Sequence, residues 1–188
     1  MKSEPPKELH SERLLLRLPC KTDFALMREY IEHPLMRKYS FFRYGDPDLY
    51  PQIYLGTAAK DWKAGTAYRM SIVLKDTNTM IGHMMLYDVN KTHRTGELGY
   101  WMAREHWGNG YTKEAAQVAL EFGFKRLRLR RIYALTIDGN DVSAALLMKL
   151  GFKHESTARK HEKIRGRYYD VHCFGLMATE YRVQSISK

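Results

Sequence analysis

Two glycines stand one residue apart in Trp107–Thr112 (WGNGYT), directly before a run of residues with helical spacing. The first turn of a helix carries main-chain N–H groups without partners and a partial positive charge, and glycines let an anion approach them. The N–H groups from Gly108 to Thr112 are therefore a candidate cradle for phosphate. The segment lacks the Lys-Ser/Thr ending of a nucleotide-triphosphate loop, and Lys113 stands where G-x-G-x-x-G requires glycine. The alternative is a tight turn that uses glycine for backbone shape alone.

A second junction of strand and helix follows in Asn140–Phe152 (NDVSAALLMKLGF). Asn140 and Ser143 fit the first turn of that helix, where a side-chain oxygen can accept a main-chain N–H bond. Gly151 fits its end. Capping the helix is the role that this position alone predicts for both side chains.

Two carboxylates stand near these segments in the sequence, and the resemblance given below implies that either could move a proton. Glu97 begins a strand, and the alternation of side chains in a strand places it on one face with Gly99 and Trp101. Its alternative role is a structural hydrogen-bond acceptor. Glu162 lies just before a hairpin turn, where its alternative role is a solvated charge among lysines and arginines.

These residues need a framework, and the sequence predicts a single α/β domain with a mixed, mostly antiparallel central sheet of about seven strands flanked by about four helices. Strands are expected at 11–20, in two segments of 67–89 joined by a turn at Asp76–Asn78, and at 96–103, 130–137, 151–164 and 168–178. Helices are expected at 21–31, capped by Thr22 or Asp23, and at 48–63, 111–125 and 140–150. The domain is expected to span residues 9–181, with flexible ends at 1–8 and 182–188.

Composition narrows the class of protein. The 188 residues carry a net charge of +10, which favours polyanionic partners such as nucleic acid, a phosphorylated cofactor or acidic protein surfaces, although solubility alone explains it equally well. The N-terminus lacks the apolar core of a signal peptide, and no apolar run is long enough to span a membrane. Two distant cysteines, Cys20 and Cys173, and eight histidines show no metal-binding spacing. A cytoplasmic protein without a metal site is expected.

Together, residues 96–115 (GELGYWMAREHWGNGYTKEA) and 140–152 resemble the acetyl-CoA-binding core of the GCN5-related N-acetyltransferase (GNAT) superfamily. With residues 11–23 (SERLLLRLPCKTD) and 166–177 (GRYYDVHCFGLM), the chain resembles the branch of ribosomal-protein N-terminal acetyltransferases. The resemblance extends over residues 9–181 and implies the GNAT fold.

The resemblance also implies which residues bind acetyl-CoA. In the family the cofactor diphosphate lies on the loop that matches Trp107, Gly108, Asn109, Gly110, Tyr111 and Thr112, and the pantetheine arm lies beside the strand that matches Tyr100, Trp101, Met102 and Ala103. Trp107 stands where the family commonly has Arg or Gln, and Thr112 where it has Gly or Ala. Contacts through main-chain N–H groups do not depend on those side chains. Asn140 is expected to hydrogen-bond the pantetheine amides.

The implied chemistry is direct acetyl transfer to an amine in a ternary complex. An amine must lose a proton before it attacks, and either Glu162 or Glu97 would take that proton. Ser143 matches the residue that gives a proton to the departing thiolate, and N–H groups near Met102 would polarise the thioester carbonyl. Cys173 has no identifiable histidine partner, so no acyl-enzyme is expected.

The branch resemblance implies a protein N-terminal amine as acceptor, of the ribosomal type. A small amine, such as an antibiotic or an amino-acid-like metabolite, is the second possibility, and a non-catalytic acyl-CoA-binding module is the third. Five basic residues between Lys125 and Arg131 could contact RNA or the coenzyme 3′-phosphate, although a solvated helix end is favoured. No membrane partner is expected, and the chain is compatible with a monomer or a homodimer.

Overall fold

The computed structural model of the chain describes residues 6–34, 39 and 49–182. In chain order, its elements are β1 (Glu8–His10), β2 (Leu14–Arg17), α1 (Phe24–Glu32), α3 (Leu49–Ala64), β3 (Tyr68–Leu74), β4 (Thr79–Asn90), β5 (Thr95–Met102), α4 (Tyr111–Glu121), β6 (Arg131–Ile137), α5 (Asp141–Lys149), β7 (Lys153–Ile164) and β8 (Arg167–Met177). Short 3₁₀ turns, η1 (Lys21–Asp23) and η2 (Arg104–His106), and a π-helical turn, η3 (Phe122–Arg126), complete the set.

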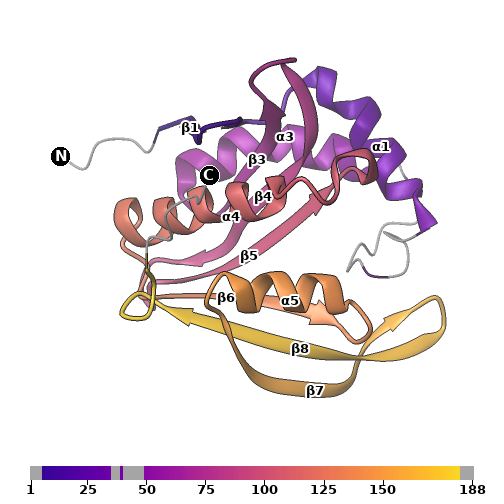
Figure 1. Cartoon of the computed structure of the whole chain (residues 1–188), viewed down its shortest axis with the longest axis vertical. Helices are drawn as coiled ribbons and strands as arrows, with labels where there is room; N and C mark the ends of the chain where they lie inside the picture. Colours follow the sequence, from indigo (N-terminus) through magenta and orange to yellow (C-terminus); the bar gives the residue numbers. More distant parts are fainter. Residues whose placement is uncertain (1–5, 35–38, 40–48, 183–188) are drawn as a thin grey trace.

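The eight strands of the described chain form one sheet in the order β1-β2-β3-β4-β5-β6-β8-β7 (Figure 1). Every neighbouring pair is antiparallel except β5 and β6, which are parallel. The sequence-based prediction of a mixed, mostly antiparallel sheet flanked by helices is confirmed. The strand beyond the expected seven is β1, which pairs with β2 from Glu8↔Arg17 to His10↔Leu15.

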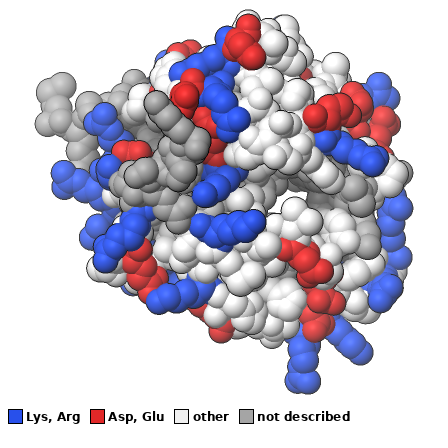
Figure 2. Space-filling view, in the orientation of Figure 1, with Lys and Arg blue, Asp and Glu red and all other residues white. Residues whose placement is uncertain are grey.

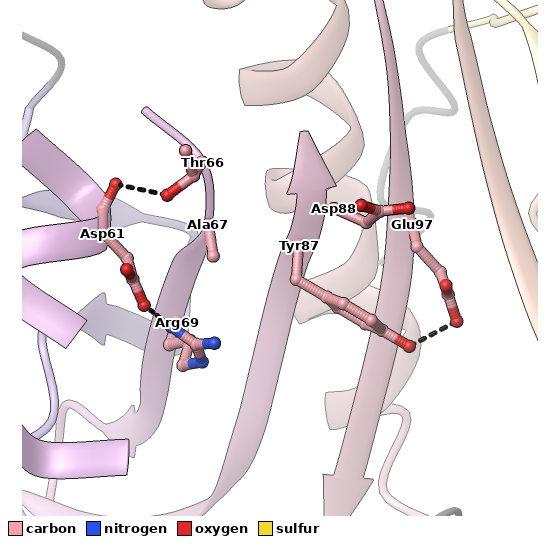
Figure 3. A pocket seen from close by; sticks show the side chains of 7 residues that line it. All are labelled: Asp61, Thr66, Ala67, Arg69, Tyr87, Asp88 and Glu97. Carbon is pink, nitrogen blue, oxygen red and sulfur yellow. Dashed lines mark hydrogen bonds and ion pairs between the residues drawn. The ribbon is translucent and has the colours of Figure 1, made fainter. Parts of the chain in front are cut away.

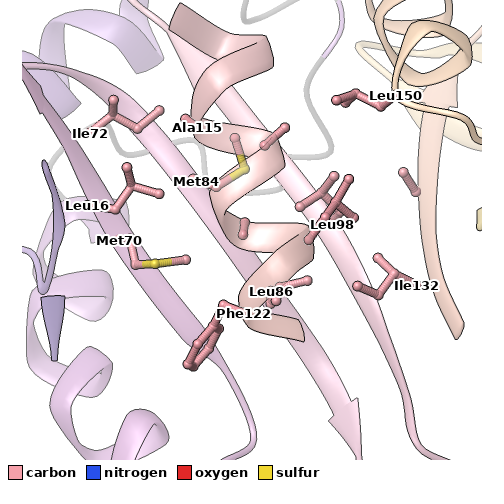
Figure 4. Packing of buried hydrophobic residues seen from close by; sticks show 14 of the residues in the cluster. Leu16, Met70, Ile72, Met84, Leu86, Leu98, Ala115, Phe122, Ile132 and Leu150 are labelled. Carbon is pink, nitrogen blue, oxygen red and sulfur yellow. The ribbon is translucent and has the colours of Figure 1, made fainter. Parts of the chain in front are cut away.

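Two buried clusters lie on the two faces of the sheet. The larger packs beneath α4 and α5, and it includes Leu98 of β5 with Ala115 of α4 (Figure 4). Met102 of β5 belongs to the same cluster. The smaller packs beneath α1 and α3, and it includes Trp101 of β5 with Tyr54 of α3. Because side chains alternate along a strand, β5 feeds both clusters and is held from both sides. That strand carries Tyr100, Trp101 and Met102, three of the residues that the resemblance assigned to cofactor binding.

Three local predictions can be compared with the structure. The turn between β7 and β8 falls at Arg165 and Gly166, whose φ angles of 49° and 83° suit a two-residue type I′ hairpin loop. The helix expected at 111–125 changes to π geometry after Glu121. Asp23 does occupy the N-cap position of α1, but its side chain forms no cap hydrogen bond there. Its carboxylate instead accepts bonds from Arg17 and Ser71.

The sequence from Tyr39 to Trp62 is rich in aromatic residues, some of which are expected to line the acceptor site, and Phe41, Phe42 and Tyr44 of this segment lie outside the described residues. Of its members within them, Tyr54 and Trp62 are 3% and 2% exposed, so both side chains belong to the core. Among the described residues, no helix has the length and apolar character needed to cross a bilayer.

Candidate acetyl-CoA and acceptor site

β5 and β6 are hydrogen-bonded neighbours only over their first residues. Their parallel register comprises three pairs and ends at Glu97↔Tyr133. β5 continues to Met102 and β6 to Ile137, so the strands diverge beyond that pair. We call the space between them the β5–β6 gap. In the space-filling view the surface is hollowed between the end of β5 and α5 (Figure 2).

The main chain of β5 turns hydrogen-bond donors toward this gap. The Ala103 N–H donates to the Ile81 carbonyl of the β4 side at 2.8 Å. Main-chain groups alternate in direction along an antiparallel strand, so the N–H groups of Tyr100 and Met102 point away from β4 and into the gap. The Met102 carbonyl points the same way and accepts a bond of 2.7 Å from Trp107 Nε1. The donors of Tyr100 and Met102 remain directed along the gap.

The segment Trp107–Thr112, here called the glycine loop, joins η2 to α4. Gly108 and Gly110 both have φ of 77°, a left-handed conformation that glycine adopts without strain. Gly110 is the N-cap of α4, and none of the described side chains caps that end. Within the described chain, the main-chain N–H groups of residues 108–113 donate no hydrogen bond. Residues 108–110 are exposed, so these donors fit an anionic ligand such as a diphosphate.

Three residues expected at the site meet across the gap. Ser143 Oγ of α5 lies 2.9 Å from the Tyr100 hydroxyl of β5. Asn140 is the N-cap of α5, and its side-chain oxygen accepts the Ser143 N–H at 3.3 Å. Burial raises the pKa of Tyr100 to about 12, although the Ser143 hydrogen bond lowers it. Asn140 therefore takes the capping role, and Ser143 presents its hydroxyl to β5.

Glu97 lies where the gap begins, and alternation along β5 directs its side chain to the face opposite that of Tyr100. The carboxylate is 8% exposed and accepts a hydrogen bond from the Tyr87 hydroxyl (Figure 3). Burial raises the pKa of Glu97, Asp88 raises it further, and hydrogen bonds with Tyr87 and Tyr133 lower it. The net effect is a carboxyl group that holds a proton more readily than usual, as suits a proton acceptor near neutral pH.

A cavity of about 410 Å³ opens beside Glu97 (Figure 3). Its lining is largely polar and combines carboxylates from α3, β4 and β5 with one guanidinium: Asp61, Thr66, Ala67, Arg69, Tyr87, Asp88 and Glu97. Arg69 is paired with Asp61, and Asp88 accepts a hydrogen bond of 2.9 Å from the Tyr133 hydroxyl. Tyr87 and Tyr133 were not singled out from the sequence, because only the register of the strands brings them beside Glu97.

The side chains of Trp101, Met102 and Ala103 are buried, with exposures of 3%, 4% and 6%. The indole of Trp101 stacks on Tyr30 at 3.7 Å and on His83 at 5.1 Å between ring centroids. Any contact of these three residues with a ligand in the gap would therefore come from the main chain.

Glu162 is far from Glu97. It pairs with Tyr169 on β8, whereas Tyr133, the partner of Glu97, pairs with Gly175. Tyr169 and Gly175 are six residues apart on β8, which corresponds to about 20 Å along the strand. The two candidate bases therefore belong to different places, and Glu97 is the one at the start of the gap.

The basic run from Lys125 to Arg131 precedes the N-terminal end of β6. The glycine loop follows the C-terminal end of β5, and the two strands are parallel, so the run and the loop lie at opposite ends of the sheet. Lys125 pairs with Glu121, and Arg131 makes two bonds of 2.6 Å to Glu155. Among residues 6–34, 39 and 49–182, no group of His, Cys, Asp and Glu side chains is arranged to hold a metal ion.

Comparison with known proteins agrees with this geometry. The family model of the acetyltransferase (GNAT) domain matches residues 13–153. The chain belongs to this family and is an N-acetyltransferase.

Relatives span nearly the whole chain. An uncharacterized N-acetyltransferase, p20 of Bacillus licheniformis, is 32% identical over 92% of this chain and 97% of its own length. A putative ribosomal N-acetyltransferase, YdaF of Bacillus subtilis (strain 168), is 25% identical over 91% of this chain and 94% of its own. Among solved structures, spermidine N-acetyltransferase from Vibrio cholerae, in complex with CoA and spermine, superposes with a TM-score of 0.79 at 24% identity, covering 91% of this chain and 99% of that one. The relatives include ribosomal-type enzymes, in accord with the branch resemblance.

Proposed function

We propose that the chain transfers an acetyl group from acetyl-CoA to a primary amine in the β5–β6 gap. The observation that carries this proposal is the set of N–H groups at the exposed start of α4 that have no partner within the described chain, together with the donors of β5. The first group suits a diphosphate, and the second suits the amide and thioester oxygens of an extended arm. A ligand with both parts would reach from one group of donors to the other.

Acetyl-CoA supplies a thioester whose carbonyl carbon accepts the amine. The Tyr100 and Met102 N–H groups would donate to the carbonyl oxygen, where negative charge develops. The hydroxyl pair of Ser143 and Tyr100 would give a proton to the departing thiolate, and their separation of 2.9 Å allows that proton to be replaced from the partner. No covalent enzyme intermediate is proposed, because burial raises the pKa of Cys173 and keeps it a thiol.

We propose Glu97 as the general base. Its raised pKa suits a group that takes a proton from the amine. Its place at the start of the gap, on the face opposite Ser143, would let the amine approach from one side while the thiolate leaves on the other. The test compares Glu97→Gln with Glu162→Gln in a thiol-release assay. Glu97→Gln is expected to lower kcat by about 10²–10⁴-fold. Glu162→Gln, a matched change on a distant strand, is expected to leave kcat within a few fold.

The pH profile gives a second readout of the same proposal. A base works only when deprotonated, so the wild-type rate should fall as pH drops through the raised pKa of Glu97. The acidic limb should vanish in Glu97→Gln. Full activity and an unchanged limb in that variant would remove Glu97 from the mechanism.

For the acceptor, we propose a protein N-terminal amine of the ribosomal type, which the relative named as a putative ribosomal N-acetyltransferase supports. A small amine is favoured by a separate observation, the carboxylate-lined cavity of about 410 Å³ beside Glu97. That size is within the range of small-molecule sites. A panel of peptide N-termini and small mono- and diamines, ranked by kcat/KM, decides between them. A diamine preference that is lost in Asp88→Asn would favour the second acceptor class.

RNA contact is a further part of the ribosomal proposal. Arg94 and Arg130 donate from their side chains to main-chain carbonyls rather than to carboxylates, which leaves their charge available to phosphates. Co-sedimentation with ribosomes across a salt series tests the contact, since binding driven by phosphates weakens steeply with salt. Binding that does not change with salt would exclude it.

A further inference from the structure

Arg13 reaches from the turn between β1 and β2 to the start of α4. Its main-chain N–H donates to Glu114 Oε1 at 3.0 Å, and its Nε and Nη2 lie 2.7 Å and 2.6 Å from Glu114 Oε2. A further side-chain nitrogen, Nη1, donates to the Asn109 carbonyl at 3.1 Å. The guanidinium carbon lies 4.5 Å from the centre of the Tyr111 ring. One side chain thus contacts the glycine loop on both sides of Gly110.

Glu114 anchors this arginine. Its side chain is 3% exposed and lies in the first turn of α4. Burial alone would raise the pKa of Glu114, but the hydrogen bonds from Arg13 and Ser11 lower it overall, so the carboxylate is charged. This buried carboxylate accepts the main-chain N–H at one oxygen and contacts two guanidinium nitrogens with the other, which fixes the guanidinium in one orientation. The position of Arg13 is therefore set before any ligand arrives.

The bond from Arg13 to Asn109 determines which donors of the loop stay free. In a continuing α-helix, the Asn109 carbonyl would accept the N–H of Lys113, four residues later. Arg13 occupies that carbonyl, and the Lys113 N–H makes no hydrogen bond within the described chain. Without Arg13, the helix could extend backward by one hydrogen bond, and the two glycines would allow the loop to rearrange. That rearrangement would remove one donor from the cradle.

We propose that Arg13 is a positioning residue for the diphosphate of acetyl-CoA: by holding the Asn109 carbonyl, it keeps the N–H groups of the glycine loop free. This inference rests on the proposed function. Glu114 largely balances the charge of Arg13, so Arg13 contributes through the orientation of its side chain rather than through net charge. Arg13 stabilises a loop in which Trp107 replaces the Arg or Gln common in the family.

The test uses a double variant, Arg13→Gln with Glu114→Gln, because Arg13→Gln alone would leave a buried carboxylate unpaired. The matched control is Arg131→Gln with Glu155→Gln, another Arg–Glu pair with two short contacts, distant from the loop. By calorimetry, the double variant is expected to bind CoA about 10–100-fold more weakly, as the loss of one hydrogen bond to a charged group implies. Its KM for acetyl-CoA should rise in parallel while kcat stays within about twofold, and the control should match wild type.

Two further readouts separate positioning from general stability. The Lys113 amide should exchange its hydrogen more slowly in the double variant, because it would then bond to Asn109. Arg13→Lys keeps a cation beside Glu114 but cannot form the fork. It should bind CoA as weakly as the double variant, and it carries the test if the double variant does not fold.

Each other outcome has a distinct meaning. Wild-type affinity for CoA in Arg13→Lys, or in a folded double variant, would overturn the inference while leaving the proposed function intact. Absence of CoA binding by the wild-type chain would overturn the proposed function itself.

Discussion

His83 makes the stability of the fold depend on pH in a way that can be measured. The imidazole is completely buried on β4, with Nδ1 2.7 Å from the Tyr54 hydroxyl and Nε2 3.4 Å from Ser71 Oγ. Burial lowers its pKa to about 3, against a smaller opposing effect of Asp23 and together with the repulsion of Arg17. The folded chain therefore keeps this ring neutral throughout the mildly acidic range.

The size of the effect follows from linkage. An unfolded histidine has a pKa of about 6.5, so as pH falls below that value the unfolded chain binds a proton that the folded chain does not. Stability is then lost at about 1.4 kcal/mol per pH unit. Between about pH 8 and pH 5, the loss from His83 alone should be about 2 kcal/mol. The loss would continue toward pH 3 and cease below it.

The assay is urea unfolding of wild type and His83→Asn at constant ionic strength across that range. Asparagine keeps a polar atom near Tyr54 but does not titrate, so the difference between the two stability curves isolates the histidine. Parallel curves would refute the argument. NMR of the wild-type chain provides an independent check, because the His83 Cε1 proton should not titrate between about pH 8 and pH 5. A titration there would be equally contrary, whether or not the variant folds.

Three further outcomes are expected. Ser143→Ala and Tyr100→Phe should each lower kcat by about 10–10²-fold, through loss of the proton relayed to the thiolate, with melting temperatures close to wild type; undiminished turnover in both would exclude that role. Thr136→Val should raise the melting temperature by about 2–4 °C, since the buried Thr136 Oγ1 has no hydrogen-bond partner in the described chain and valine keeps the shape of the side chain. A lower melting temperature would show that the hydroxyl is hydrogen-bonded. Gly82→Ala should destabilise the fold by about 1–3 kcal/mol in urea unfolding, because the Cβ of the alanine would stand 2.4 Å from the Trp101 carbonyl oxygen. Unchanged stability would mean that β4 and β5 can separate freely.

Most of the sheet and the helices could be predicted from local patterns. Short apolar stretches bounded by turn residues mark β3 to β6, and capping residues and glycines mark the helix ends, because these signals act over a few residues. Two features depend on distant parts of the chain and were not predictable in this way. The strand β1 forms only because β2 supplies its partner. The π-helical turn after Glu121 lies where Gly123 packs against Ile132 of β6, in a contact too close to admit a Cβ.

The same distinction applies to the candidate site. Asn140, Ser143 and the glycine loop carry local signals, and the structure places Ser143 against Tyr100. Arg13 carries no such signal, because Glu114, its partner, is 101 residues away. The choice between Glu97 and Glu162 also required the register of the strands between them, which no local spacing encodes.

The three residue pairs that join β5 to β6 are the shortest pairing between any two inner strands of the described sheet. Strands β1 to β5 form one hydrogen-bonded ribbon and β6 to β8 another, and the side chains of the larger cluster do most to keep the ribbons together. Cooperative opening should begin along that line, with amides of β6 losing protection from solvent exchange before those in the middle of β4. An extended ligand bound between the two ribbons would take the place of a strand there. It would add hydrogen bonds between β1–β5 and β6–β8, which the chain itself joins through only three residue pairs.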